Sequence, residues 1–111
     1  MHEDSLIEIQ MEEAAQMIAA VSNGRRMNLI KILLSSEHNV GDLAMKIGLS
    51  QSATSQHLRI LKITGILLQR KDAQIRFCRI NPNMVSVLER LICIAEEGVS
   101  SVDKNTERYG P

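Results

Sequence analysis

The chain has 111 residues, of which 44% are hydrophobic, so it is long enough for one domain with a core and too short for two. Phe77 is the only aromatic residue besides Tyr109, which argues against a protein that stacks unpaired bases on aromatic rings. The start of the chain lacks the basic and apolar regions of a signal peptide, and no apolar run approaches a membrane span. With two cysteines, Cys78 and Cys93, a reducing cytoplasm is the expected location.

The 13 basic and 13 acidic residues balance overall but are segregated along the chain. Residues 1–21 carry five acidic side chains and no Lys or Arg, whereas residues 57–80 carry six basic side chains against one acidic one. A protein that touches a polyanion with one face needs a local positive potential, not a high overall charge. The alternative is an ordinary solvated charged surface.

Four helices are predicted before residue 65. Apolar residues at three- and four-residue steps predict the first over about 6–21 and the second, capped by Asn23, up to residues 35–39. A short third helix over about 40–47 ends at Gly48, a natural left-handed cap. Ser50 then caps a fourth helix over about 51–64. Two short helices joined by a three-residue turn containing Gly are typical of a helix-turn-helix.

Two strand-like runs, 66–70 and 75–80, predict a hairpin, although its connection lacks the Asn-Gly or Asp-Gly pair that hairpin turns favour. Asn81 and Pro82 then start a last helix that runs to about Glu97. Residues 1–99 are therefore expected to form one winged helix-turn-helix domain, mainly α with a small β-hairpin in the order α-α-α-α-β-β-α. Residues 100–111 are expected to form a polar, flexible tail.

The fourth helix carries polar side chains suited to the major groove of double-stranded DNA. Amides pair with adenine, Arg pairs with guanine, and Ser accepts or donates to several base edges. The residues expected to read bases are Gln51, Ser52, Ser55, Gln56 and Arg59. Residues expected to contact the DNA backbone, on this helix and on the wing, are Thr54, His57, Lys62, Arg70, Lys71, Arg76 and Arg79.

Residues 40–61, VGDLAMKIGLSQSATSQHLRIL, with the wing residues 70–74, RKDAQ, resemble the ArsR/SmtB family of winged helix-turn-helix regulators. The run 50–58 is most similar to the branch of nodulation-gene repressors, haemolysin activators and biofilm repressors. The resemblance implies a homodimer, paired through its first and last helices, that represses transcription from inverted-repeat operators. The broad apolar face of the last helix independently favours a partner surface, or else a deeply buried helix. The expected interface residues are Ile7, Met11, Met17, Met84, Leu88, Leu91, Ile92 and Ala95.

Many members of that family sense metals through two cysteines in a Glu-Leu-Cys-Val-Cys-Asp run, and the matching residues 37–42 read Glu-His-Asn-Val-Gly-Asp. Without thiolates this run is a poor site for a soft metal, and no metal or cofactor is expected. Cys93 or Cys78 leaves open a thiol-based redox or sulfur-responsive regulator, although a lone cysteine is more often a passive apolar residue.

No catalytic triad, phosphate loop or paired carboxylates appear in the sequence, so an enzyme is not expected. The other alternative is a winged-helix module that binds a protein instead of DNA. Ile60 and Ile63, on the far side of the fourth helix, favour that alternative, whereas the polar first turn favours DNA.

Overall fold

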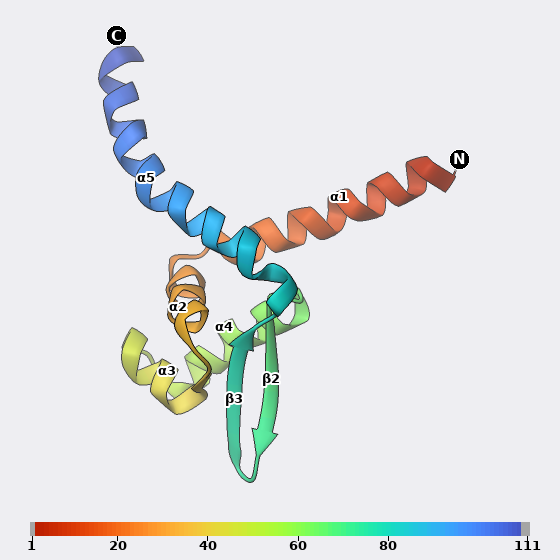
Figure 1. The fold of residues 1–111 in the computed structure, drawn as a ribbon, viewed down its shortest axis with the longest axis vertical. Coiled ribbons are helices and arrows are strands. Elements are labelled where there is room, and N and C mark those ends of the chain that lie inside the picture. Colours follow the sequence, from red (N-terminus) through yellow and green to blue (C-terminus); the bar gives the residue numbers. More distant parts are fainter. Residues whose placement is uncertain (1, 110–111) are drawn as a thin grey trace.

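The computed structural model describes residues 2–109 and the side chains of residues 8 and 10–98. The predicted element order is confirmed: four helices, a hairpin and a last helix (Figure 1). The elements are α1 (His2–Val21), α2 (Gly24–Ser35), β1 (His38–Asn39), α3 (Val40–Ile47), α4 (Gln51–Ile63), β2 (Leu67–Asp72), β3 (Ile75–Ile80), the 3-10 turn η1 (Pro82–Met84) and α5 (Val85–Tyr109).

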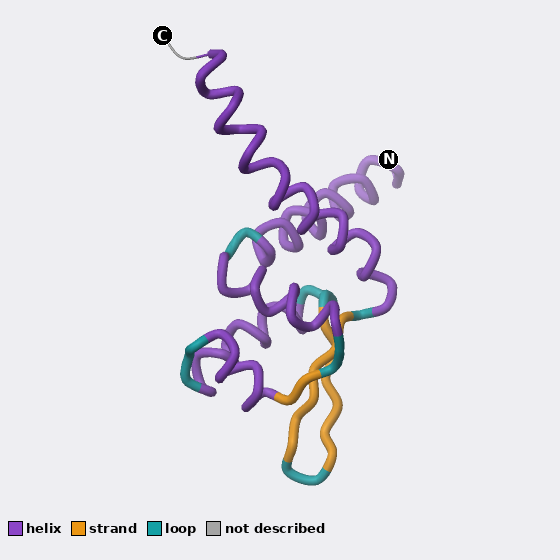
Figure 2. The backbone as a smooth tube through the Cα atoms, turned by 60° about the vertical axis from the view of Figure 1, so that its left-hand side comes forward, coloured by secondary structure: helices purple, strands orange, loops and turns teal. Residues whose placement is uncertain are grey.

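The hairpin β2–β3 projects from one end of the molecule, whereas α1 and α5 lie at the other end (Figure 1). Turned by 60°, the tube view still shows the hairpin extending beyond the helices, so it forms a wing (Figure 2). The three-stranded antiparallel sheet has the order β1-β3-β2, and β1 pairs His38 with Cys78. β1 was not predicted from the sequence, because a strand of two residues shows no alternation of apolar and polar side chains.

One core joins the helices to the base of the wing. Its fully buried members include Leu29 and Ile30 of α2, Leu43 of α3, and Leu58 and Leu61 of α4. Ile66, Leu67, Cys78, Ile80 and Leu88 extend this cluster under the hairpin and α5. The core therefore fixes α4 against α2 and α3 on one side and against the wing on the other.

Local capping explains why the predicted boundaries of α2, α3 and α4 agree with the structure. The side chains of Asn23, Asn39 and Ser50 accept hydrogen bonds from the backbone N–H groups three residues later. Gly48 ends α3 with a positive φ of 72°, a conformation that costs glycine little. These caps place the three-residue turn, and hence the start of α4.

The two outer helices are longer than the sequence analysis predicted. α1 begins at His2 instead of about Leu6, and α5 continues to Tyr109 instead of ending near Glu97. Residues 100–109, predicted as a loose tail, therefore continue the last helix, since no proline or glycine interrupts them. Within the described part of the chain, no helix combines the length and the hydropathy that crossing a membrane requires.

Candidate nucleic-acid interface

α4 has one buried face and one polar face. Thr54, Leu58 and Leu61 are fully buried, so the side of the helix that carries them is fixed in the core. The Ser50 side chain accepts from the Ala53 N–H at 3.1 Å and holds the first turn in place. The polar side chains on the opposite side are therefore presented from a rigid helix.

The polar face of α4 and the wing together form a groove of about 580 Å³. It brings together most of the side chains predicted to read bases with two side chains from the wing. Its lining residues are Ser52, Ser55, Gln56, Arg59, Lys62, Gln69 and Arg76. The structure thus places donors, acceptors and three cationic groups along one concave surface, an arrangement suited to the edges and phosphates of a duplex.

Gln51, the fifth predicted base reader, lies in a neighbouring cleft of about 300 Å³. This cleft is formed by the starts of α3 and α4 and by the wing, and Gln74 and Arg76 line it from the wing side. Arg76 lines both hollows, so the two form a continuous polar surface between α4 and the wing.

The wing separates its basic residues onto two faces. In the β2–β3 register Gln69 pairs with Cys78 and Lys71 pairs with Arg76, so these residues share the face toward α4. Arg70 pairs with Phe77, and Arg79 with Leu68, on the opposite face. Of the four basic wing residues predicted to contact the DNA backbone, only Arg76 lines the groove. Lys71 shares the face of Arg76 without lining the groove, and Arg70 and Arg79 lie on the opposite face.

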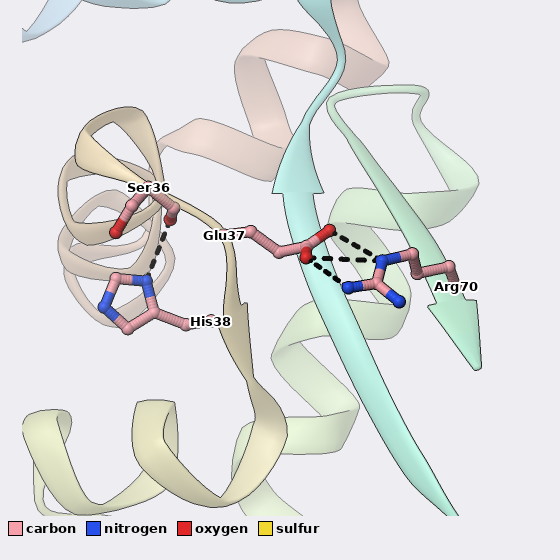
Figure 3. A network of polar contacts seen from close by, with 4 residues as sticks. All are labelled: Ser36, Glu37, His38 and Arg70. Carbon is pink, nitrogen blue, oxygen red and sulfur yellow. Dashed lines mark hydrogen bonds and ion pairs between the residues drawn. The ribbon is translucent and has the colours of Figure 1, made fainter. Parts of the chain in front are cut away.

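Arg70 is held on that opposite face by two contacts. Its guanidinium donates to the Glu37 carboxylate, with Nη2 2.7 Å from Oε1 (Figure 3), and lies 4.4 Å from the centroid of the Phe77 ring. The hydrogen bond from Arg70 lowers the pKa of Glu37, and the positive charge of Arg79 lowers it further. The same hydrogen bond raises the pKa of Arg70.

Two residues of α4 predicted to contact phosphates have other partners. Thr54 is fully buried and its hydroxyl donates to the Ser50 carbonyl at 2.8 Å, so the prediction of a phosphate contact is wrong for this side chain. Thr54 lies on the inner side of the helix, one turn from Leu58, and this position in the sequence already argues against a phosphate contact. The Nδ1 atom of the half-buried His57 lies 3.4 Å from the Arg26 guanidinium.

The residues matching the metal-binding run of the family are already engaged in protein contacts. Glu37 binds Arg70, and the His38 ring lies 2.8 Å from the Ser36 carbonyl (Figure 3). Asn39 caps α3, and its amide group donates to Asp42. Among the described residues, no group of three His, Cys, Asp or Glu side chains is placed to hold a metal ion.

Neither cysteine has the environment of a reactive thiol. Cys78 is fully buried in the core, and this burial raises the pKa of its thiol. Cys93 is exposed, but the negative charge of Glu97, 3.6 Å away, raises its pKa as well. A redox sensor needs an accessible thiol with a lowered pKa, so these environments disfavour the thiol-based alternative.

A second surface, which we call the apolar groove, lies between α1 and α5 at the end opposite the wing. It has a volume of about 200 Å³, and every side chain that lines it is apolar. Its lining residues are Ala14, Met17, Ile18, Val21, Ile66, Met84, Val87, Leu88 and Leu91.

The apolar groove contains four of the predicted interface residues and two large exposed apolar residues that the prediction omitted. Ile18 and Val87 are 65% and 52% exposed, and their spacing of four residues from Ala14 and Leu91 is the signal that identifies them. Leu88 is only 3% exposed and belongs mainly to the chain's own core.

The remaining predicted interface residues lie outside the groove lining. Met11 and Ala95 are exposed on α1 and α5, whereas Ile92 is half-buried against the core. The side chain of Ile7 lies outside the described residues.

Two arginines at the start of α2 make contacts that were not predicted from the sequence. Arg25 donates to the Ile47 carbonyl at the end of α3 at 3.2 Å, and Arg26 donates to the Ala20 carbonyl at the end of α1 at 2.5 Å. The Arg-Arg pair directly after the Asn23 cap is visible in the sequence, but its partners lie on other helices and carry no sequence signal.

The winged helix-turn-helix fold, with a polar helix beside a basic wing, defines a class of DNA-binding proteins. Residues 23–67 match the family model described as bacterial regulatory protein, arsR family. The chain is 37% identical over 89 residues to the transcriptional activator HlyU of Vibrio cholerae, covering 77% of this chain and 82% of HlyU. It is 28% identical over 95 residues to the biofilm growth-associated repressor of Xylella fastidiosa, covering 82% of this chain and 83% of that protein.

Among solved structures, the fold is similar to the homodimeric winged helix-turn-helix DNA-binding domain from Mycobacterium bovis, with a TM-score of 0.78. That likeness covers 85% of this chain and 88% of the other at 22% sequence identity. The chain belongs to the ArsR family of bacterial regulatory proteins, as the resemblance implied, and is a DNA-binding transcriptional regulator and not an enzyme.

Proposed function

We propose that the protein is a sequence-specific repressor that binds an inverted-repeat operator as a homodimer. The observation that carries this proposal is the groove in which Ser52, Ser55, Gln56 and Arg59 of α4 share one concave surface with Arg76 of the wing. An α-helix fits the major groove of B-DNA, where amide, hydroxyl and guanidinium groups distinguish the base pairs. The wing would then meet the flanking phosphates through Lys71 and Arg76.

The roles within this surface follow from position along α4. Gln51, Ser52, Ser55 and Gln56 lie in the first two turns, where a recognition helix meets base edges, so we assign them to base reading together with Arg59. Lys62 lies in the last turn, where a flexible cation suits a phosphate. Arg70 and Arg79 are left out of the proposed contacts because they lie on the far face of the wing.

The apolar groove between α1 and α5 supports the homodimer. Ile18, Val87 and Leu91 expose large apolar side chains there, and no side chain in the described part of the monomer covers them. A second copy, related by a two-fold axis, would bury the same patch on both chains. Such a dimer sets two recognition helices about one DNA turn, or roughly 34 Å, apart, and its symmetry matches that of an inverted repeat. The similar domain from Mycobacterium bovis is homodimeric.

Repression follows from occupation of a promoter by such a dimer, which excludes other proteins from the same duplex. One relative is named a repressor and another a transcriptional activator, so the direction of control has to be measured on this chain itself. The test is a reporter gene placed behind the selected operator. Lower expression in the presence of the protein supports repression, and higher expression contradicts it.

The operator itself is tested by selection. The reduced protein is incubated with randomised duplexes at about 100 mM salt, a range in which sequence-independent binding is weakened. The bound fraction is sequenced for the wild type, for Gln56→Ala and for Asn28→Ala, a matched loss of an exposed amide on α2. We expect an inverted repeat that Gln56→Ala alters at particular bases and Asn28→Ala leaves unchanged. Weak, salt-sensitive retention without an enriched sequence would overturn the proposal and favour a protein-binding module.

A further inference from the structure

Arg26 makes a polar connection between three helices. From the first turn of α2, its Nε donates to the Ala20 carbonyl at 2.5 Å and its Nη2 to the Ala19 carbonyl at 3.4 Å, both at the end of α1. Its Nη1 lies 3.4 Å from Nδ1 of His57, in the middle of α4. Because arginine only donates, a hydrogen bond at this contact has Nδ1 of His57 as its acceptor.

The α1–α2 corner is built around this side chain. The Arg26 N–H donates to the Asn23 side chain, which caps α2, while the guanidinium donates to two carbonyls at the end of α1. The Ala19 carbonyl also accepts from the N–H and the hydroxyl of Ser22. Arg26 is half-buried, so these hydrogen bonds are partly protected from water. The corner therefore has a preferred geometry that is set by a side chain as well as by the backbone.

α1 is anchored almost entirely at this end. Of its described side chains only Ala20 is buried, with Met17 and Val21 half-buried, and those of residues 10–16 are all exposed. The helix extends away from the rest of the chain toward its N-terminus (Figure 1). An open groove of about 370 Å³ separates Gln16 and Ala19 of α1 from Ile60 and Ile63 of α4, so the described parts of the two helices pack together only near Ala20.

A helix anchored at one end acts as a lever. With its 20 residues α1 is about 30 Å long, so a tilt of about 10° at Ala20 moves the far end by about 5 Å. That displacement exceeds the rise of one base pair, about 3.4 Å. If α1 pairs two copies of the chain, its angle to α4 sets how far apart the two recognition helices stand.

We propose that Arg26 is a positioning residue that fixes the angle between α1 and the recognition helix, and thereby the spacing of operator half-sites that the dimer accepts. The inference rests on the proposed function, because it needs a homodimer that uses α1 and a two-part operator. It assigns Arg26 no contact with DNA. Its role is exerted through the Ala19 and Ala20 carbonyls and through His57.

The test measures spacing preference separately from affinity. Duplexes carrying the selected half-sites at spacings one base pair shorter, equal and longer compete for the wild type, Arg26→Met and Arg25→Met, the matched loss of the neighbouring arginine. We expect the wild type to prefer its optimum by at least about tenfold, since a displaced half-site loses base contacts. Arg26→Met should lower this preference to about threefold or less. His57→Phe should also lower the preference for the optimal spacing, and Arg25→Met should leave that preference unchanged.

A second measurement needs no DNA. Spin labels at Gln10→Cys on α1 and Lys46→Cys on α3, in a Cys93→Ser background, report the angle of α1 to the helix-turn-helix as a distance distribution. Arg26→Met should broaden that distribution, and Arg26→Lys, which keeps the charge but not the three-way geometry, should broaden it too. This readout keeps the inference testable if a variant binds DNA too weakly to compare spacings.

The outcomes separate the two proposals. A wild type that enriches no repeat contradicts the proposed function. A wild type with a sharp optimum, together with an Arg26→Met variant that keeps the same optimum and the same distance distribution, overturns the role of Arg26 alone.

Discussion

The guanidinium of Arg70 on β2 forms a two-pronged ion pair with the carboxylate of Glu37, which directly precedes β1, at Nη2–Oε1 and Nε–Oε2 distances of 2.7 and 3.1 Å. The contact ties the wing to the segment that leads into the helix-turn-helix. The ion pair also engages Glu37, which matches the first residue of the metal-binding run found in many members of the family. In this chain Glu37 therefore helps to hold the wing in place.

This ion pair predicts a pH dependence for Glu37. Because the Arg70 hydrogen bond lowers its pKa below the ordinary value of 4.5, the folded chain gains stability from the ionised carboxylate above that value. The gain disappears as the pH falls through the lowered pKa. We expect NMR titration of the Glu37 carboxyl carbon to show the lowered pKa, and Arg70→Gln to return it toward 4.5. An unchanged Glu37 pKa in Arg70→Gln would contradict the pairing in solution.

The two faces of the wing predict different effects for two arginines only six residues apart. Arg76→Ala should weaken DNA binding and reduce the slope of log affinity against log salt by about 0.9, the loss of one phosphate contact. Arg70→Ala removes the same charge from the far face and should leave the slope unchanged. Binding curves at several salt concentrations distinguish the two variants. Equal slope changes would show that both faces of the wing reach the duplex.

The helix-turn-helix follows from local sequence, whereas the orientation of the wing residues does not. Gly48 and Ser50 act within a few residues of themselves, so the turn and the start of α4 were predictable from local chemistry. The face of the wing on which Arg70 and Arg79 lie depends on the register of the hairpin. The turn Ala73–Gln74 determines this register, although it contains no glycine. Ala73 instead adopts a positive φ of 56°, which its residue type does not reveal.

Contacts between distant segments explain most of what the sequence analysis missed. Glu37 and Arg70 lie 33 residues apart, and Arg26 and His57 lie 31 residues apart, so neither pair follows from a helical or strand period. The burial of Thr54 could be predicted from the sequence, because this residue lies beside Leu58 on the helical wheel. The base-reading roles assigned to α4 stay predictions until an operator is known.

The surroundings of Cys93 predict how the thiols react. On α5, Cys93 lies five residues beyond Leu88 and two beyond Leu91, about 140° to 160° around the helix from the apolar groove, so it stays accessible in the proposed dimer. Since the Glu97 carboxylate raises its pKa, Glu97→Gln should lower that pKa and speed alkylation by iodoacetamide at about pH 8. Glu89→Gln, which removes a carboxylate one turn away on the other side, is the matched control.

Mass spectrometry identifies which thiol is alkylated. Cys78 should react only after denaturation, because it is fully buried in the core. Alkylation of Cys78 at the same rate as Cys93 in the folded protein, or no change in the Cys93 rate with Glu97→Gln, would contradict these environments.

The apolar groove predicts that one charge abolishes the dimer. Ile18 is 65% exposed in the monomer, so Ile18→Asp should change the core of the single chain little. At a two-fold interface the substitution buries two unpaired carboxylates, which should raise the dimer dissociation constant by at least about a hundredfold. Sedimentation velocity should therefore show a dimer for the wild type and a monomer for Ile18→Asp.

Met45→Asp is the matched control for this substitution, because Met45 is 83% exposed on α3, outside the groove lining. Its sedimentation should equal that of the wild type. Binding to a partner stabilises a folded chain by an amount that grows with the logarithm of the partner's concentration, so the melting temperature of the wild type should rise with protein concentration. The melting temperature of Ile18→Asp should not. A variant that still sediments as a dimer, with a concentration-dependent melting temperature, would place the interface on another surface, and α1 could then no longer set the distance between two recognition helices.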